Sequence, residues 1–303
     1  MVSLEAVRST WGSLASRGPG YEPQPPGPLH EWSAVRGYFL DLRAKTEAPG
    51  ASEPRALQPA ALAQLALGYW DRSLAGETGS AAAFDRLCGL LAERGEKAAD
   101  GRRWPYSVPV AKYRLRPPWH SAMAQGQVAS VFVRAHLATG EERWRTLARE
   151  AVRPLLATAT SDLVTLTLAG PILEEAPSAP RSHILNGWIY ALWGLWDVHV
   201  GLGDEGAGDR FAAGSRCLAS LLERYDLGWW TRYSLYPHRV LDLAKPFYHR
   251  LHATQAAIMH RLTGLGEFAH AAERWPEYDE PLRRTLALAQ KGVFVVAVRA
   301  FDR

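Results

Sequence analysis

A short polar sequence, Gln125-Gly126-Gln127, opens a predicted helix and carries two amides that can both donate and accept hydrogen bonds. Pro117 and Pro118 end the segment before it, and Ser121 is placed to cap the helix. Apolar residues then recur at helical spacing at positions 128, 131, 132 and 135. We interpret the stretch from Trp119 to Gln127 as one wall of a polar pocket that holds a sugar or peptide. The alternative is a buried helix start whose amides bond loop backbone.

The composition is that of a folded chain with charges of both signs. Its 303 residues are 47% hydrophobic, and the formal net charge is only +4. Because acidic and basic residues are interspersed, a nucleic-acid-binding patch is not indicated. Cys88 and Cys217 lie far apart within apolar helical patterns. We expect two buried thiols there, with neither a disulfide nor a metal cluster.

Several classes of protein are excluded by what the sequence lacks. No segment reaches the roughly 18 apolar residues that a membrane-spanning helix needs, and the N-terminus has no continuous apolar run. There is no phosphate-binding glycine loop and no clustered Cys/His spacing. We therefore expect a cytoplasmic protein with no membrane span, no metal, and no flavin or nucleotide cofactor.

Helical periodicity covers most of the chain. The expected helices are residues 57–74, 81–94, 127–139, 141–156, 183–200, 209–225, 248–262 and 281–298. Short connections that contain glycine, at 138–142 and 201–208, are typical of antiparallel helix hairpins. The sequence predicts an all-α fold, an (α/α) toroid or barrel of such hairpins, and the alternative is an open helical solenoid.

Three segments depart from this pattern. Residues 1–50 are expected to form a partly irregular N-terminal extension to a toroid domain at 51–303, with a loop at 18–28 and a short strand or helix end at 37–42. The segment 232–247 is interrupted by Pro237 and Pro246 and is rich in polar groups, as functional loops are. The apolar run 292–298 either closes the helical array or forms the contact of a homodimer.

A series of short blocks in this sequence resembles the helical domain of D-glucuronyl C5-epimerases. The blocks run in order over residues 37 to about 278, and the series is far more specific than any single member. They are GYFLD at 37–41, LQP at 57–59, LGY at 67–69, SAMAQGQ at 121–127, RA at 134–135, TG at 139–140, EEAP at 174–177, HILNGW at 183–188, LWGLWD at 192–197, YDLG at 225–228, and YH at 248–249 followed by His252 and Gln255.

The resemblance implies a reaction at carbon 5 of glucuronate in heparan-type polysaccharides. The family removes the proton beside the carboxylate and returns one to the opposite face. Such a carbon acid needs a base, an acid, and donors or cations for the enediolate. Tyrosines serve as the acid and the base in the family. Because a phenol has a pKa near 10, the resemblance also implies an arginine and buried hydrogen bonds nearby.

The family's residues are only partly present here. By the resemblance, Tyr233 and Tyr248 fall on two catalytic tyrosines. The third tyrosine is replaced by Ala176, although Glu175 and Pro177 are kept on either side. An arginine suited to the substrate carboxylate is replaced by Tyr236, although Arg232 and Arg239 lie close in sequence.

Other side chains are candidates to complete the site. Glu175, His249, His252 or His238 could replace the missing phenol, and the alternative for each histidine is a structural hydrogen bond. We assign catalysis to Tyr248, Tyr233, Glu175 and His249. The expected substrate contacts are Gln125, Gln127, Asn186, Arg232, Tyr236, His252 and Trp119.

Three functions remain open at this stage. The first is an epimerase-like isomerase that acts on a glucuronyl residue of an oligosaccharide, or a lyase if the abstracted proton is not returned. The second is a scaffold repurposed as an isomerase, cyclase or lyase for a bacterial natural product or peptide without a uronate carboxylate, as the residues at 176 and 236 indicate. The third is a non-catalytic carbohydrate-binding protein, which the two tyrosines disfavour.

Overall fold

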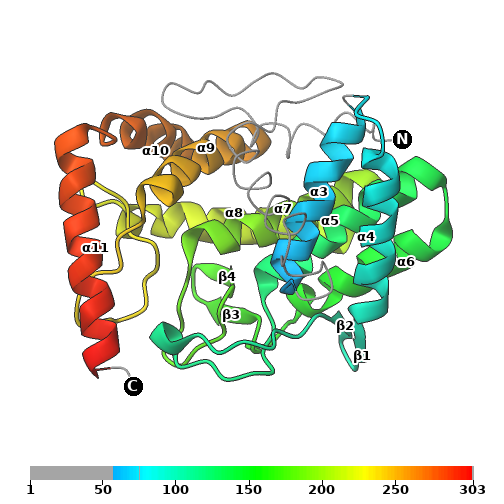
Figure 1. The fold of residues 1–303 in the computed structure, drawn as a ribbon, viewed down its shortest axis with the longest axis horizontal. Coiled ribbons are helices and arrows are strands. Elements are labelled where there is room, and N and C mark those ends of the chain that lie inside the picture. The colour runs from blue at the N-terminus through cyan, green and yellow to red at the C-terminus, as the bar shows by residue number, and fades with distance from the viewer. Residues whose placement is uncertain (1–56, 75, 302–303) are drawn as a thin grey trace.

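The computed structural model describes residues 57–74 and 76–301, and this part of the chain is mainly helical (Figure 1). The expected loop at 18–28, the strand or helix end at 37–42 and the extension at 1–50 lie outside the described residues. Most helices come in consecutive pairs joined by short connections. The pairs are α3 Pro59–Leu74 with α4 Ser80–Arg94, α5 Ala122–Thr139 with α6 Glu142–Val152, α7 Leu185–Leu202 with α8 Glu205–Leu221, and α9 Pro246–Thr263 with α10 Gly266–Glu277.

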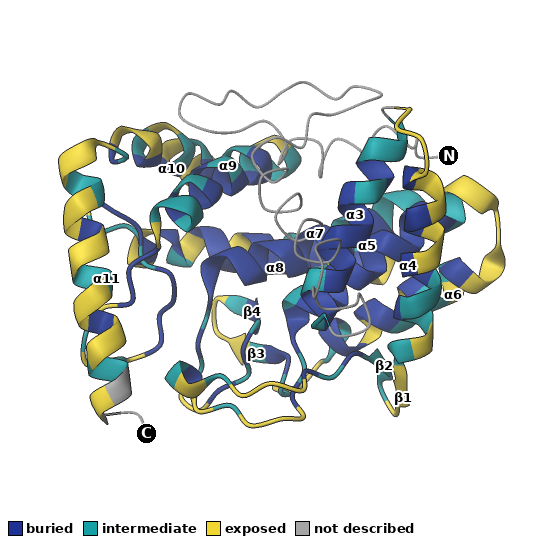
Figure 2. Cartoon of the chain, in the orientation of Figure 1, coloured by how far each residue is buried: buried dark blue, intermediate teal, exposed yellow. Residues whose placement is uncertain are grey.

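These pairs stand side by side and form two rows. The first helices of the pairs are neighbours in the order α3, α5, α7, α9, and each also packs on its own partner. Helices α5 and α7 are buried over most of their length, whereas α4, α6 and α10 expose one side (Figure 2). A helix that is apolar on nearly all sides belongs inside a protein, and one with a single apolar stripe covers it. The core therefore lies along α5 and α7.

Helices α5 and α7 cross unusually closely because both carry glycine at the crossing. A Cβ atom on Gly194 would lie 2.2 Å from Cα of Gly126, which no real side chain tolerates. Small residues at a helix crossing let the two backbones approach. Further along the same helices, Arg134 donates to Asp197 at 2.7 Å, and both side chains are fully buried. The glycine contact and this ion pair fix the register of the two helices.

The ends of these helices follow the signals in the sequence. Ser121 caps α5 by accepting a hydrogen bond from the Ala124 amide. At the other end Gly140 has φ of 73°, a left-handed conformation that glycine adopts without strain, and it begins the turn to α6. The hairpin expected around residues 138–142 is therefore confirmed. Cys88 and Cys217 are buried free thiols, also as expected.

Several elements differ from the sequence prediction. The prediction missed α10 as well as two short antiparallel hairpins, β1 Glu96–Ala98 with β2 Gly101–Arg103, and β3 Val164–Thr167 with β4 Gly170–Leu173. Strands of three or four residues are too short to show an alternating pattern, and α10 contains Pro276. Single-turn 3₁₀ helices, η3 Arg153–Leu156 and η4 Leu222–Tyr225, end two of the expected helices, and η2 Ala111–Tyr113 lies in a loop.

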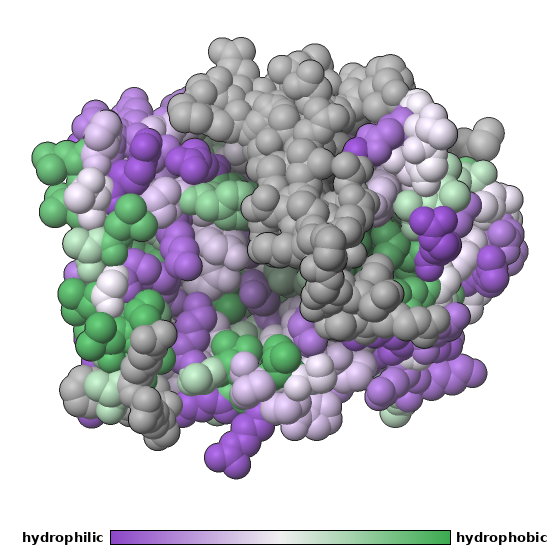
Figure 3. Space-filling view, in the orientation of Figure 1, coloured by the Kyte–Doolittle hydropathy of each residue, from purple (hydrophilic) through white to green (hydrophobic). Residues whose placement is uncertain are grey.

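The C-terminal helix, α11 Pro281–Phe301, packs along one side on α9 and nearby loops. Ala287 and Phe294 on its inner side are buried. The opposite side exposes apolar residues, which give the green surface over α11 at the left of Figure 3. These exposed residues include Leu282, Leu286, Val293 and Val296. The apolar run at 292–298 is thus divided between the core and the surface.

Candidate active site

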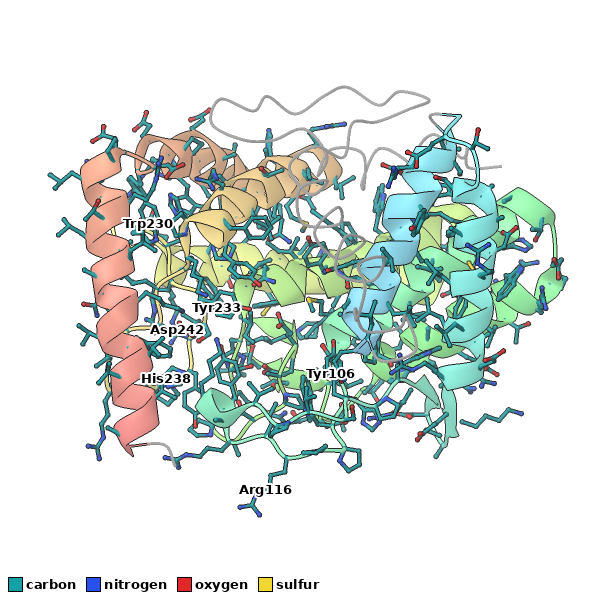
Figure 4. All side chains as sticks on the ribbon, viewed as in Figure 1. Tyr106, Arg116, Trp230, Tyr233, His238 and Asp242 are labelled. Atoms are coloured by element: carbon teal, nitrogen blue, oxygen red, sulfur yellow. The ribbon has the colours of Figure 1, made fainter. Side chains whose placement is uncertain are left out.

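The candidate site is built around an extended segment, residues 231–235, that lies between two other loops. Tyr233 accepts a backbone hydrogen bond from Leu185, the first residue of α7, and its own N–H donates to the carbonyl of Asp242 at 2.7 Å. Leu235 N–H donates to Ser182. These bonds fix the backbone of Tyr233 against the start of α7. Figure 4 shows Tyr233, Asp242 and His238 together between α11 and the centre of the molecule.

The rings of Tyr233 and Tyr248 meet edge to face. Their centroids are 5.0 Å apart and their planes are inclined at 72°. Tyr248 lies in the first turn of α9, which Pro246 begins. Tyr233 is 9% exposed, and burial together with the nearby Glu175 raises its pKa well above the usual range. The structure therefore brings together the two phenols named from the sequence.

Glu175 directs a buried carboxyl oxygen toward the first turn of α7. The residue as a whole is half-buried, but its Oε2 atom is buried and has no hydrogen-bond partner in the described structure. A Cβ atom on Gly187 would lie only 2.0 Å from this oxygen. Burial raises the pKa of Glu175 to about 7, and the charge of Lys112 opposes the rise. A carboxyl group with this pKa can both take up and release a proton near neutral pH.

The neighbouring loop residues form one buried cluster with the two phenols. Its buried members are Tyr113, Ala176, Ile184, Tyr233, Tyr236 and Ala244, and Tyr248 packs against it. Ala176 thus lies in the same cluster as Tyr233. Tyr236 is also in the cluster, and its ring lies 5.5 Å from that of Tyr113. Positions 176 and 236 therefore both border the phenol pair.

Sequence reasoning missed four residues of this region: Lys112, Tyr113, Asp242 and Lys291. Lys112 and Tyr113 belong to η2, Asp242 lies in the loop before α9, and Lys291 lies in α11. Lys112 bonds Asp242 at 3.2 Å, and Lys291 makes a short ion pair with the same carboxylate. No motif in the sequence marks them, because 130 residues separate Lys112 from Asp242. The polar character of the segment 232–247 was a signal for Asp242 alone.

The two glutamines near the start of α5 have different roles. Gln125 donates to the carbonyls of Arg102 and Ala151, and its oxygen accepts from the Trp104 N–H. These bonds favour the alternative for Gln125, an amide that bonds buried loop backbone, and its contact with substrate stays a prediction. Gln127 is also fully buried, yet neither atom of its amide has a partner in the described structure. It remains a candidate polar contact.

Asn186 and Gln255 form a second polar group at the start of α7. The Gln255 side chain donates to the backbone carbonyl of Asn186 at 3.2 Å. The oxygens of both side-chain amides are buried and lack a hydrogen-bond partner among the described residues. Buried amides without partners are uncommon, because leaving them unpaired costs free energy. Asn186 therefore stays a predicted substrate contact, and Gln255 joins it.

Two buried histidines of α9, His249 and His252, both bond the hydroxyl of Thr231. His249 is fully buried, stacks on Trp230 with centroids 3.9 Å apart, and bonds Thr231 Oγ1 and the Trp275 carbonyl. Burial lowers its pKa to about 4. Because both ring nitrogens are engaged, the structure favours the structural alternative for His249, and its assignment to catalysis stays a prediction. His252 bonds the same threonine at 3.1 Å, and burial lowers its pKa well below the usual value.

Two further candidates, Trp119 and Arg232, lie outside the cluster that contains the phenol pair. Trp119 stacks on Tyr106 with centroids 4.1 Å apart and donates to the Val108 carbonyl. Arg232 precedes Tyr233 in the extended segment, where successive side chains point to opposite sides. The groups that act on the Arg232 guanidinium include Arg224 and Tyr225, and burial lowers its pKa. The roles of Trp119 and Arg232 as substrate contacts stay predictions.

The described residues contain no group of three or more metal-ligating side chains and no helix long and apolar enough to cross a membrane. What the site does contain is a pair of phenols and a carboxyl group that titrates near neutral pH. Such an arrangement is suited to moving protons, which is the chemistry of isomerases of the epimerase class.

Comparison with known proteins agrees with this class. The family model for the D-glucuronyl C5-epimerase C-terminus matches residues 99–277, and the chain belongs to this family. It is 33% identical over 202 residues to the D-glucuronyl C5-epimerase of Caenorhabditis elegans, a match that covers 58% of this chain but 32% of that protein. An uncharacterised protein of Methanocaldococcus jannaschii is 25% identical over 179 residues, which are 57% of each chain. The chain thus spans about a third and somewhat over half of these relatives.

Proposed function

We propose that this chain is an epimerase-like enzyme that removes a proton from a carbon beside a carboxylate and returns one to the opposite face. The substrate is a glucuronyl residue of an oligosaccharide, and the carbon is C5. The observation that carries the proposal is the edge-to-face pair of Tyr233 and Tyr248 next to Glu175, whose pKa is about 7. Membership of the epimerase family supports the same reaction class.

The three groups have distinct roles in this proposal. Tyr248 and Tyr233 exchange the C5 proton, and Glu175 supplies the acid or base that is absent at Ala176. Glu175 can gain or lose a proton near neutral pH because its pKa is about 7. Burial raises the pKa of Tyr233 well above the usual range, so its phenol keeps its proton. Gln127, Asn186 and Gln255 offer unpaired amide atoms for sugar hydroxyls.

A second candidate function follows from positions 176 and 236. Both border the phenol pair, and both lack the group that the family uses. A scaffold altered at these two places could instead isomerise, cyclise or cleave a bacterial natural product or peptide that has no uronate carboxylate. A lyase differs from the epimerase only in that the abstracted proton is not returned and the group at carbon 4 leaves.

Other features of the proposal concern the whole protein. We propose that residues 51–303 form one domain in which the helix pairs close into an (α/α) toroid, and that the protein works in the cytoplasm. The homodimer and the polysaccharide substrate also remain part of the proposal. Light scattering of the purified protein tests the oligomeric state.

The experiment that tests the function is isotope exchange. The purified protein is incubated in heavy water with a heparosan oligosaccharide, and deuterium at C5 is read by mass spectrometry and proton NMR. Deuterium with an iduronate product is the expected result, and an unsaturated product would identify a lyase. Absence of exchange with folded protein would reject the uronate reaction and favour the second candidate.

A further inference from the structure

Two lysines from distant parts of the chain share one buried carboxylate beside the phenol pair. Lys112 of η2 bonds Oδ2 of Asp242 at 3.2 Å, and Lys291 of α11 pairs with Oδ1 of the same residue. Lys291 also donates to the Leu243 carbonyl at 2.9 Å. Asp242 is only 2% exposed. The group therefore carries two positive charges and one negative charge, which leaves one positive charge in excess.

This excess charge faces the ring of Tyr233. The Lys112 amine lies 4.3 Å from the centroid of Tyr233 and 4.7 Å from that of Tyr113, so it is held between two aromatic faces. The Lys291 amine lies 5.5 Å from the centroid of the same Tyr233 ring. Glu175 is close enough for the charge of Lys112 to lower its pKa. Lys112 thus lies among the groups to which the proton-transfer role is assigned.

The two lysines differ in their access to a ligand. The side chain of Lys291 is 13% exposed and that of Lys112 is 28% exposed. Lys291 is engaged by both the Asp242 carboxylate and the Leu243 carbonyl. Because Lys291 neutralises Asp242, the charge of Lys112 is not cancelled by that carboxylate. A partly buried cation that stays accessible to solvent can bind an anionic group.

We propose that Lys112 binds the carboxylate of the substrate and stabilises the enediolate that forms from it, and that Lys291 and Asp242 are positioning residues for its amine. This inference rests on the proposed function and names the residue that selects an acidic sugar. The negative charge of the enediolate grows on the carboxylate oxygens, so one cation serves both the bound substrate and the intermediate. It also gives α11, which lies beyond the region matched by the family model, a part in the site.

The test measures binding without requiring turnover. Calorimetry compares the affinity for a heparosan hexasaccharide with that for its carboxyl-reduced form, in which each uronate is a neutral glucose. The wild-type protein is expected to prefer the acidic form. Lys112→Met is expected to lose this preference by about ten- to a hundredfold, the range of one charge-assisted hydrogen bond. Lys112→Arg keeps the charge and is expected to restore most of the preference.

Matched variants separate charge recognition from structural effects. Lys245→Met removes an exposed lysine from the residue that precedes α9, and the preference is expected to stay at the wild-type level. In Lys291→Met, Asp242 draws the charge of Lys112 to itself, so the preference is expected to fall to an intermediate value. Circular dichroism and urea unfolding establish that each variant is folded.

The outcomes for the two proposals are distinguishable. If the wild-type protein does not prefer the acidic form, or if folded Lys112→Met prefers it as strongly as the wild type, the assignment of Lys112 is wrong whatever the result of isotope exchange. If the preference depends on Lys112 but no deuterium enters C5, the carboxylate site stands and the proposed reaction fails. Recognition that depends on Lys112 together with exchange supports both.

Discussion

Gly187 and Glu175 fit together without room for a side chain on the glycine. A Cβ atom at position 187 would lie 2.0 Å from Oε2 of Glu175 and 2.5 Å from its Cβ. The helix start at Asn186 and Gly187 thus receives the carboxyl group of the adjacent loop. Oε2 finds no donor among the described residues, and burial raises the pKa of Glu175 to about 7 against the opposing charge of Lys112.

Substitution of Gly187 by alanine should therefore displace Glu175. The added methyl group has no space unless the carboxyl group moves, so we expect C5 exchange to fall by about tenfold or more and the free energy of unfolding to fall by about 1–3 kcal/mol. Gly89→Ala is the matched control, because a Cβ there meets nothing within 4 Å in the middle of α4. That control should be about 0.5–1 kcal/mol more stable than the wild type. Equal effects of the two substitutions would contradict the close fit.

Tyr248→Phe removes one hydroxyl and little volume. If Tyr248 transfers the C5 proton, we expect exchange to fall by about a hundredfold or more while circular dichroism and substrate affinity change little. Tyr278→Phe serves as the control, since its hydroxyl bonds Asp226 away from the phenol cluster. Full exchange activity in Tyr248→Phe would remove this residue from the mechanism.

The pH dependence of stability should contain two opposing contributions. Glu175 has a folded pKa of about 7 against about 4.5 when unfolded, so its contribution is present at low pH and is lost as pH rises from about 4.5 to 7. His249 has a folded pKa of about 4 against 6.5, so its contribution is present above 6.5 and is lost as pH falls toward 4. Each amounts to about 3 kcal/mol.

Glu175→Gln should expose the histidine contribution. The neutral amide does not ionise, so the variant lacks the loss of stability that Glu175 causes as the pH rises. Its free energy of unfolding should therefore rise more steeply between pH 4.5 and 6.5 than that of the wild type. His252, whose pKa is also lowered by burial, acts in the same direction as His249. Urea unfolding at half-unit pH intervals measures both slopes. Identical slopes in the variant and the wild type would show that the pKa of Glu175 is not raised in the folded protein.

Ala176→Tyr restores the family residue in a cluster that is already filled. Ala176 is 3% exposed and shares this cluster with Tyr113, Tyr233 and Tyr236. A phenol added there should cost about 1–3 kcal/mol of stability. Combination with Tyr113→Ala, which opens space in the same cluster, should recover part of that loss. A uronate substrate predicts that exchange increases in the double variant, and unchanged exchange would count against a uronate.

The helices were largely predictable because their signals are local. The cap at Ser121, the left-handed Gly140 and the apolar spacing of α5 and α7 all lie within the elements that they define. The β3–β4 hairpin, by contrast, has strands of four residues, and its position beside Glu174 depends on a backbone bond from Ala122 to the Glu174 carbonyl. Contacts of this kind arise only from tertiary packing.

The site was predictable only where a motif is continuous. Tyr233, Tyr248 and Glu175 were found because each lies in or beside a block that resembles the family. Lys291 and Asp242 meet across 49 residues without any such block. Gln125 and Gln127 illustrate a finer limit, because residues two apart on a helix differ by about 200° in direction. One amide therefore bonds loop backbone and the other lies unpaired, although the sequence treats them alike.

The close crossing at Gly126 and Gly194 fixes the positions of α5 and α7 independently of the loops around the site. Because α5 and α7 are in backbone contact, Gln127 and Asn186 keep their places near the starts of these helices when the loops change. Ala176 and Tyr236 both lie in loops outside those helices. Substitutions in these loops can therefore change the proton-transfer groups and the charge of the site while the crossing of the two helices stays as it is.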